Sequence, residues 1–271
     1  MSILTNVILL LLGGTAVFIF GNPYYDILPT NGSPLYLAVL TALFLLTAFL
    51  LQRSPGKKAL GQAVYALAAA SAASLLLSTG IFNLPFNQYT GMKNLAIDKF
   101  SQFLHVVPVI LVMTLSARWK LKDMYIQKGD LKAGLRFGLL WFVLFAAAAW
   151  LIQIGPAGTD PAMLGQLPWL LLFVFANATM EELWFRGIFL RSYEGLIGRR
   201  WAILVTALVF GGSHISAAYA FPGGGVVFGL VVFGLGAVGA HAMMKDDSVI
   251  GPVIFHAGYD LMVIASVLNT L

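Results

Sequence analysis

Long apolar segments separated by short polar connections occupy almost the whole chain. Nine can be drawn, at residues 3–20, 35–51, 59–82, 100–115, 135–154, 167–190, 201–218, 222–244 and 249–268. Most approach the roughly 20 residues that an α-helix needs to cross a bilayer. Only 10% of the 271 residues are charged, whereas a soluble domain carries about 25%. The sequence therefore predicts an all-α, polytopic transmembrane helix bundle of eight or nine helices, the lower number applying if one segment is re-entrant.

The basic residues predict how this bundle is oriented. With the N-terminus inside, the outer connections hold only Lys93 and Lys99. Twelve basic residues fall on the inner side: Arg53, Lys57, Lys58, Arg118, Lys120, Lys122, Lys128, Lys132, Arg191, Arg199, Arg200 and Lys245. Because basic residues collect in cytoplasmic loops, we expect an integral membrane protein with a cytoplasmic N-terminus. The first segment has no basic flank or clear cleavage site, so we expect it to be retained.

Composition also restricts the chemistry. The chain has no cysteine, which excludes disulfides, thiolate metal sites and a cysteine nucleophile. The net charge of +5 is explained by the cytoplasmic loops, so we expect no nucleic-acid partner. The alanine- and glycine-rich composition favours a prokaryotic inner (cell) membrane. We divide the chain into N-terminal transmembrane helices (1–166) and a C-terminal functional part (167–271), within one membrane-embedded domain.

A few strongly polar side chains interrupt the C-terminal apolar segments. They are Glu181, Glu182 and Arg186 in the sixth segment, His214 in the seventh, and His256 and Asp260 in the ninth. A charge at the centre of a membrane helix costs about 2.5–3.5 kcal/mol on insertion scales, so such residues usually mark a functional site. The sequence therefore predicts a site built from three helices.

Spacing predicts how these side chains are arranged. Glu182 and Arg186 are four residues apart on one helix face and can pair, which lowers the cost of burying both. Glu181 points about 100° away from Glu182 and can face another neighbour. Phe210 lies one turn before His214. Asp260 follows His256 by the same interval, so it can fix the imidazole tautomer or face a substrate.

Two kinds of chemistry fit one glutamate and two histidines. In the first, one carboxylate takes a proton from water, one imidazole shares or relays it, and the other donates to an oxyanion. In the second, Glu181, His214 and His256 ligate a zinc ion that keeps an open position. Both routes hydrolyse an amide. On the residues alone both routes stay open, one without a cofactor and one with zinc.

At these positions the chain resembles the CPBP family of intramembrane proteases, which includes CAAX-processing and bacteriocin-processing enzymes. The family motifs are Glu-Glu-x-x-x-Arg, Phe-x-x-x-His and His-x-x-x-Asn. This chain has Glu181-Glu182-x-x-x-Arg186, Phe210-x-x-x-His214 and His256-x-x-x-Asp260. Aspartate at position 260 departs from the usual asparagine, and an ionised aspartate can only accept hydrogen bonds.

The resemblance implies a role for each matched residue. Glu181 would activate water together with His214, and His256 with Asp260 would hold the oxyanion. On this resemblance we favour the route with no cofactor, and zinc is the alternative. Glu182 and Arg186, with Phe210, would shape the site or bind substrate. The implied function is an intramembrane endopeptidase acting on a membrane-associated protein or peptide. Candidate reactions are CAAX-type processing, leader removal and cleavage of a C-terminal anchor or sorting signal.

Other functions and roles stay open. A proton-coupled transporter also uses glutamate and histidine, but it predicts a polar path across the whole membrane. A catalytically silent immunity or scaffold protein is a third possibility. The pair of Glu182 and Arg186 fits a structural role as well as a substrate contact. His105 and His241 are expected to be hydrogen-bonded packing residues.

Overall fold

The computed structural model describes residues 2–23, 25, 27–84, 88–154, 161–216 and 224–268, with side chains except at 153–154, 161–164 and 266–268. In this part of the chain all regular structure is helical. The α-helices are α1 (Ile3–Thr15), α2 (Pro34–Arg53), α3 (Lys58–Thr79), α4 (Gly91–Ser116), α5 (Leu131–Ala149), α7 (Pro161–Glu182), α8 (Leu190–Ile197), α9 (Arg199–Ser213), α10 (Gly224–Asp246) and α11 (Ile250–Leu268). Three π-helical turns, η1 (Ala16–Phe20), η4 (Trp150–Ile154) and η5 (Leu183–Gly187), continue α1, α5 and α7.

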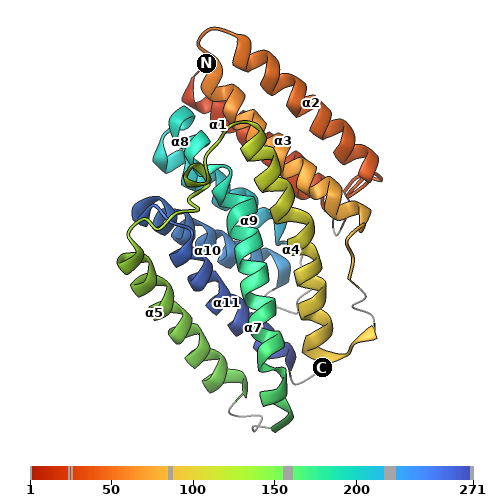
Figure 1. Cartoon of the computed structure of the whole chain (residues 1–271), viewed down its shortest axis with the longest axis vertical. Helices are drawn as coiled ribbons and strands as arrows, with labels where there is room; N and C mark the ends of the chain where they lie inside the picture. Colours follow the sequence, from red (N-terminus) through yellow and green to blue (C-terminus); the bar gives the residue numbers. More distant parts are fainter. Residues whose placement is uncertain are drawn as a thin grey trace.

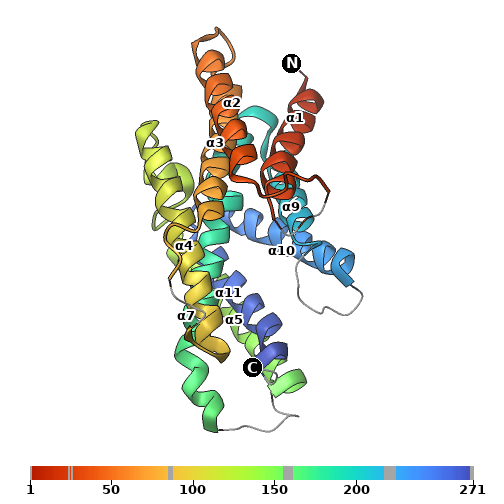
Figure 2. The same ribbon diagram turned by 90° about the vertical axis from the view of Figure 1, so that its right-hand side faces the viewer.

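The helices form a bundle with the site-bearing elements in its middle. Figure 1 shows the antiparallel pair of α2 and α3 at one end of the molecule and α5 at the other. Between them α4 packs along α7, α7 along α11, and α11 along α5. Figure 2 shows α10 running across the other helices, where it packs mainly on α9. Each of the motif helices α7, α9 and α11 therefore packs against other helices of the bundle.

Small residues explain the close approach of α2 and α3. The face of α3 that meets other helices is almost entirely alanine and serine, and these residues are buried. Across the contact, the Thr41 hydroxyl donates to the Ser71 hydroxyl at 2.9 Å. Lipid tails are as apolar as the helix surfaces, so the hydrophobic effect does not drive two membrane helices together. Small side chains allow the close packing that stabilises the pair instead.

Most predicted segment boundaries agree with the helices to within a few residues, with three corrections. The polar connection predicted at 83–99 is wrong from Gly91 onward, because α4 begins there. The sixth segment does not continue as one helix to Leu190: α7 passes into η5, and α8 is a separate short helix. The seventh helix ends at Ser213, and its predicted end at Ala218 lies outside the described residues.

The membrane character of the bundle is clear from its helices. Within the described chain, six helices are long and apolar enough to cross a membrane. They correspond to the first five predicted segments and the eighth. The other three predicted segments correspond to α7, α9 and α11, the helices that carry the polar motifs. Of these, α9 has only 15 residues, and the described apolar part of α11 is also short.

At one end of the bundle, the loop before α5, the short helix α8 and the loop before α11 contact one another. Arg191 of α8 forms an ion pair with Asp247, and its guanidinium carbon lies 4.3 Å from the centre of the Tyr125 ring. The Tyr125 carbonyl accepts from the Val249 amide at 2.9 Å, just before α11. Burial raises the pKa of Tyr125 to about 12, so its phenol is neutral beneath the cation. The loops preceding α5 and α11 are thus joined to α8.

Candidate functional site

The C-terminal end of α7 supplies the two carboxylates. After Glu182 the helix changes to the π-helical turn η5, a feature that is frequent at functional sites. The Glu182 carboxylate accepts from Arg186 Nε at 2.6 Å and pairs also with Arg186 Nη2. Both side chains are buried, with exposures of 1% and 0%. The predicted ion pair therefore exists inside the bundle.

Helices α9 and α10 enclose this ion pair. The Arg186 guanidinium carbon lies 4.4 Å from the centre of the Phe210 ring. From α10, Gly236 and Gly239 face the pair, and a methyl group at Gly236 would stand 3.5 Å from Arg186 Nη1 and 3.0 Å from Phe210. The glycines of α10 thus leave room for a buried arginine. The three residues predicted to shape the site, Glu182, Arg186 and Phe210, lie together.

His256 of α11 contacts both carboxylates of α7. Its Nδ1 lies 2.9 Å from Glu182 Oε1, and its Nε2 lies 3.5 Å from Glu181 Oε2. The Asp260 carboxylate is also 3.5 Å from Nε2. Because a carboxylate paired with arginine accepts hydrogen bonds, Nδ1 is the donor to Glu182. His256 therefore directs Nε2 toward Glu181 and Asp260.

His214 approaches Glu181 from α9. It lies at the C-terminal cap of that helix, and its Nδ1 is 2.8 Å from the Phe210 carbonyl oxygen. A carbonyl can only accept, so Nδ1 carries the proton and Nε2 is left to face Glu181. The distance from Nε2 to Glu181 Oε2 is 3.7 Å. The Ser213 hydroxyl donates to the same carbonyl. It is therefore hydrogen-bonded to its own helix and does not point toward Glu181 as a nucleophile would.

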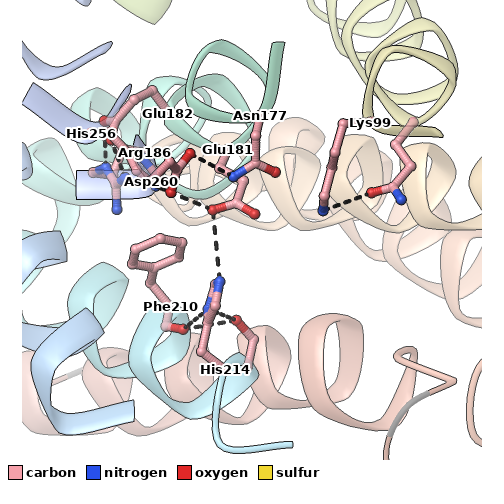
Figure 3. A network of polar contacts seen from close by, with 11 residues as sticks. Lys99, Asn177, Glu181, Glu182, Arg186, Phe210, His214, His256 and Asp260 are labelled. Carbon is pink, nitrogen blue, oxygen red and sulfur yellow. Dashed lines mark hydrogen bonds and ion pairs between the residues drawn. The ribbon is translucent and has the colours of Figure 1, made fainter. Parts of the chain in front are cut away.

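One carboxylate oxygen is therefore the centre of the site. Figure 3 shows Glu181 between His214 on one side and the group of Glu182, Arg186, His256 and Asp260 on the other. Glu181 Oε2 is buried and has no hydrogen-bond partner among the described residues. Two imidazole Nε2 atoms face it at distances longer than a direct hydrogen bond. This geometry suits a small polar molecule that bridges the three atoms.

Asn177 belongs to the site although the sequence analysis did not find it. It lies one turn before Glu181 on α7, and its amide nitrogen donates to Asp260 Oδ2 at 2.9 Å. Its amide oxygen is buried without a partner in the described chain. The available signal was its spacing, since a buried amide four residues before a motif glutamate lies on the same helix face.

A lysine also lies near this layer of the bundle. Lys99 was predicted in an outer connection, but it lies inside α4, and Figure 3 shows it on the side of Asn177 that faces away from His256. Its Nζ donates to the Gln102 side-chain oxygen at 3.1 Å. The early start of α4 is the reason that sequence inspection misplaced it.

The two remaining histidines lie outside the site. His105 is buried, where its Nε2 accepts from the Phe82 amide at 3.0 Å and its Nδ1 contacts the Ser101 carbonyl at 2.7 Å. These contacts agree with the predicted packing role. His241 does not fit that role, because it is exposed on α10 and lines a cavity of about 410 Å³ beside Lys245. Neither this cavity nor a second one at the start of α5 includes a site residue.

The possible metal ligands are the same three residues named from the sequence. Glu181, His214 and His256 supply one oxygen and two nitrogens, a donor set that suits zinc. Across the described residues, however, no three histidine, aspartate or glutamate side chains form a group arranged to hold a metal ion.

Comparison with known proteins finds one family model that matches part of the chain. Residues 163–262 match the family model described as type II CAAX prenyl endopeptidase Rce1-like. The matched segment contains all three motifs and Asn177. No curated protein and no solved structure matches the chain.

Proposed function

Because residues 163–262 match the model of type II CAAX prenyl endopeptidase Rce1-like proteins, we propose that this chain is an intramembrane protease. It would hydrolyse a peptide bond of a membrane-associated protein or peptide with water activated by Glu181. The observation that supports this mechanism most is the meeting of Glu181 Oε2 with two imidazole nitrogens, at 3.7 Å and 3.5 Å, in a buried layer of the bundle.

In the first step, Glu181 and His214 act on one water molecule. The water binds between Glu181 Oε2 and His214 Nε2, and its oxygen attacks the carbonyl carbon of the substrate. Glu181 takes the released proton as the new carbon–oxygen bond forms. His214 orients the water, because its other nitrogen is fixed by the Phe210 carbonyl.

In the second step, the carbon–nitrogen bond breaks. The proton held by Glu181 passes to the leaving nitrogen, either directly or through His214 Nε2, and the products are a carboxylic acid and an amine. His256 acts here as an imidazolium ion: its Nδ1–H donates to Glu182, and its Nε2–H donates to the oxyanion of the tetrahedral intermediate. Arg186 keeps Glu182 in place for this contact.

Zinc hydrolysis is the alternative at the same three side chains. If the protein binds zinc, Glu181, His214 and His256 would hold it, and the ion would supply a more acidic water. Metal analysis of the purified protein, followed by chelation and zinc addition, distinguishes the routes. One equivalent of zinc, with activity lost on chelation and restored by zinc, would reject the metal-free mechanism.

The proposed substrates are membrane-associated peptides with a bond that reaches the layer of Glu181. Prenylated C-termini, leader peptides and C-terminal sorting signals are the classes to compare. We also propose a prokaryotic cell membrane as the location, with the N-terminus in the cytoplasm. The support for that orientation is the excess of basic residues in the inner connections.

The test is cleavage of quenched-fluorescent peptides that carry an apolar or prenyl anchor, with the protein in liposomes. We expect Glu181→Gln and His214→Ala to lower kcat by about 10²–10⁴, the usual contribution of general acid–base catalysis. The matched control is Glu194→Gln, which changes an exposed glutamate of α8 and should leave kcat unchanged. Turnover retained by Glu181→Gln would remove the proposed mechanism.

A further inference from the structure

The start of α5 carries a row of basic side chains that has no part in the site described above. Lys128, Lys132 and Arg136 are spaced four residues apart, so the two within α5 share a helix face and Lys128 precedes them by the same interval. All three line one cavity of about 640 Å³, and all three are exposed. Among the described residues, Arg186 and Arg191 form ion pairs with carboxylates, and these three side chains do not.

The charge of this cavity is strongly positive. Its wall holds one carboxylate, Asp130, and that group already caps α5 by accepting from the Ala133 amide at 3.0 Å. Three cations therefore face one carboxylate that is hydrogen-bonded to backbone. An anion with several oxygens, such as a phosphodiester, is the ligand that this arrangement would attract.

The other side of the cavity is apolar. Leu131, Leu135 and Leu139 also line it, and they continue along α5 for about 12 Å at 1.5 Å per residue. Beyond them the same helix exposes Leu140, at 59%, and Val143, at 61%. In an integral membrane protein this surface faces hydrocarbon, and Figure 1 shows α5 at the edge of the bundle.

We propose that this cavity, the α5 lipid site, binds one anionic phospholipid. The phosphate accepts from Lys128, Lys132 and Arg136, and an acyl chain lies along the three leucines. Positive charge beside an apolar wall selects a lipid over free phosphate, which would leave the leucines without a partner. It also selects an anionic lipid over a zwitterionic one, whose choline group would meet the cations.

A lipid at this position would stabilise a helix pair that matters for the site. The Asp130 amide donates to the Asp246 carbonyl at 2.7 Å, and the rings of Phe137 and Phe255 lie 5.1 Å apart. The ring contact packs α5 against α11, which carries His256, and the hydrogen bond joins the start of α5 to the end of α10. The α5 lipid site is nevertheless independent of the proposed enzymatic function, because it would bind lipid in an inactive protein.

The test uses the purified full chain in a neutral detergent and native mass spectrometry with dioleoylphosphatidylglycerol or dioleoylphosphatidylcholine. We expect retention of one phosphatidylglycerol, at least about fivefold above phosphatidylcholine. Lys128→Gln/Lys132→Gln/Arg136→Gln should lose that preference. The matched control, Arg53→Gln/Lys57→Gln/Lys58→Gln, removes the same charge from the exposed connection between α2 and α3 and should keep it.

Several outcomes would overturn the proposal. Equal retention by the parent and the α5 variant means that the three cations do not bind the lipid. Equal loss in both triple variants means that net charge, and no particular site, attracts it. Displacement by millimolar inorganic phosphate means that the site holds a free anion. Lys128→Gln, which changes a residue before the helix, provides a milder variant if the triple one fails to fold.

Discussion

At the scale of single residues, Asp260 and Asn177 form the least expected contact of the site. The family motif more often has an amide at position 260, and here a carboxylate stands there. The amide is supplied instead by Asn177, which donates to Asp260 Oδ2 from the neighbouring helix. One amide and one carboxylate are thus paired at this place in the site.

This contact predicts a reciprocal exchange. Asn177→Asp would place two carboxylates side by side and lower kcat/KM by about tenfold or more, which corresponds to about 1.4 kcal/mol. Adding Asp260→Asn restores an amide–carboxylate pair, so the double variant should recover to within about fivefold of the parent. Cleavage of the anchored peptides measures this, and thermal unfolding of all variants controls for folding. A double variant as slow as Asn177→Asp would show that the two side chains do not act as a pair.

At the scale of elements, the contact of α5 with α11 depends on glycine. A methyl group added at Gly138 would stand 2.8 Å from the Gly251 carbonyl oxygen and 2.8 Å from Ile254 Cβ. Both atoms belong to the backbone or a branched side chain that cannot turn away. The absence of a side chain at Gly138 therefore allows α11 to approach α5 this closely. Because α11 carries His256, this approach also affects the position of His256.

This packing predicts opposite results for two glycine-to-alanine changes. Gly138→Ala should lower the free energy of unfolding by about 1–3 kcal/mol, the usual cost of overpacking. Gly234→Ala on α10 adds a methyl group to open space and should be neutral or raise stability by up to about 1 kcal/mol, because alanine favours the helix. Unfolding in mixed micelles measures both. Equal effects of the two changes would contradict the packing argument.

At the scale of the whole molecule, three of the connections that were predicted on the inner side contact one another. The loop before α5, the helix α8 and the loop before α11 contact one another through Arg191 and Tyr125. They join the ends of the helices that carry Glu181 and His256. From the charge on these connections we propose that they lie on the cytoplasmic side of the membrane.

The absence of cysteine from the sequence makes that orientation directly measurable. Single cysteines at Thr30 and at Lys57 replace exposed residues that lie beyond the two opposite ends of α2. With the N-terminus inside, a membrane-impermeant maleimide should label Thr30→Cys in intact cells and Lys57→Cys only after lysis. The reverse labelling pattern would show that the bundle is inserted the other way round.

The sequence by itself determined the class of fold and named every residue of the candidate site except Asn177. Apolar segment length and low charge predict a helical membrane bundle, and the cost of burying charge in lipid marks Glu181, Glu182 and Arg186 as functional. The i,i+4 rule also predicted the ion pair, because both partners lie on one helix.

Only the tertiary structure decided the contacts between helices. Spacing along one helix does not specify which neighbour a side chain meets, so the bond of His256 to Glu182 and the pairing of Asn177 with Asp260 were not predictable. The start of α4 at Gly91 was missed for a related reason: polar residues there lower hydropathy, while packing against α7 keeps the segment helical. Glu181 lies between two imidazoles because α7, α9 and α11 pack together there. The sequence of any one of these helices does not predict which neighbours it will have.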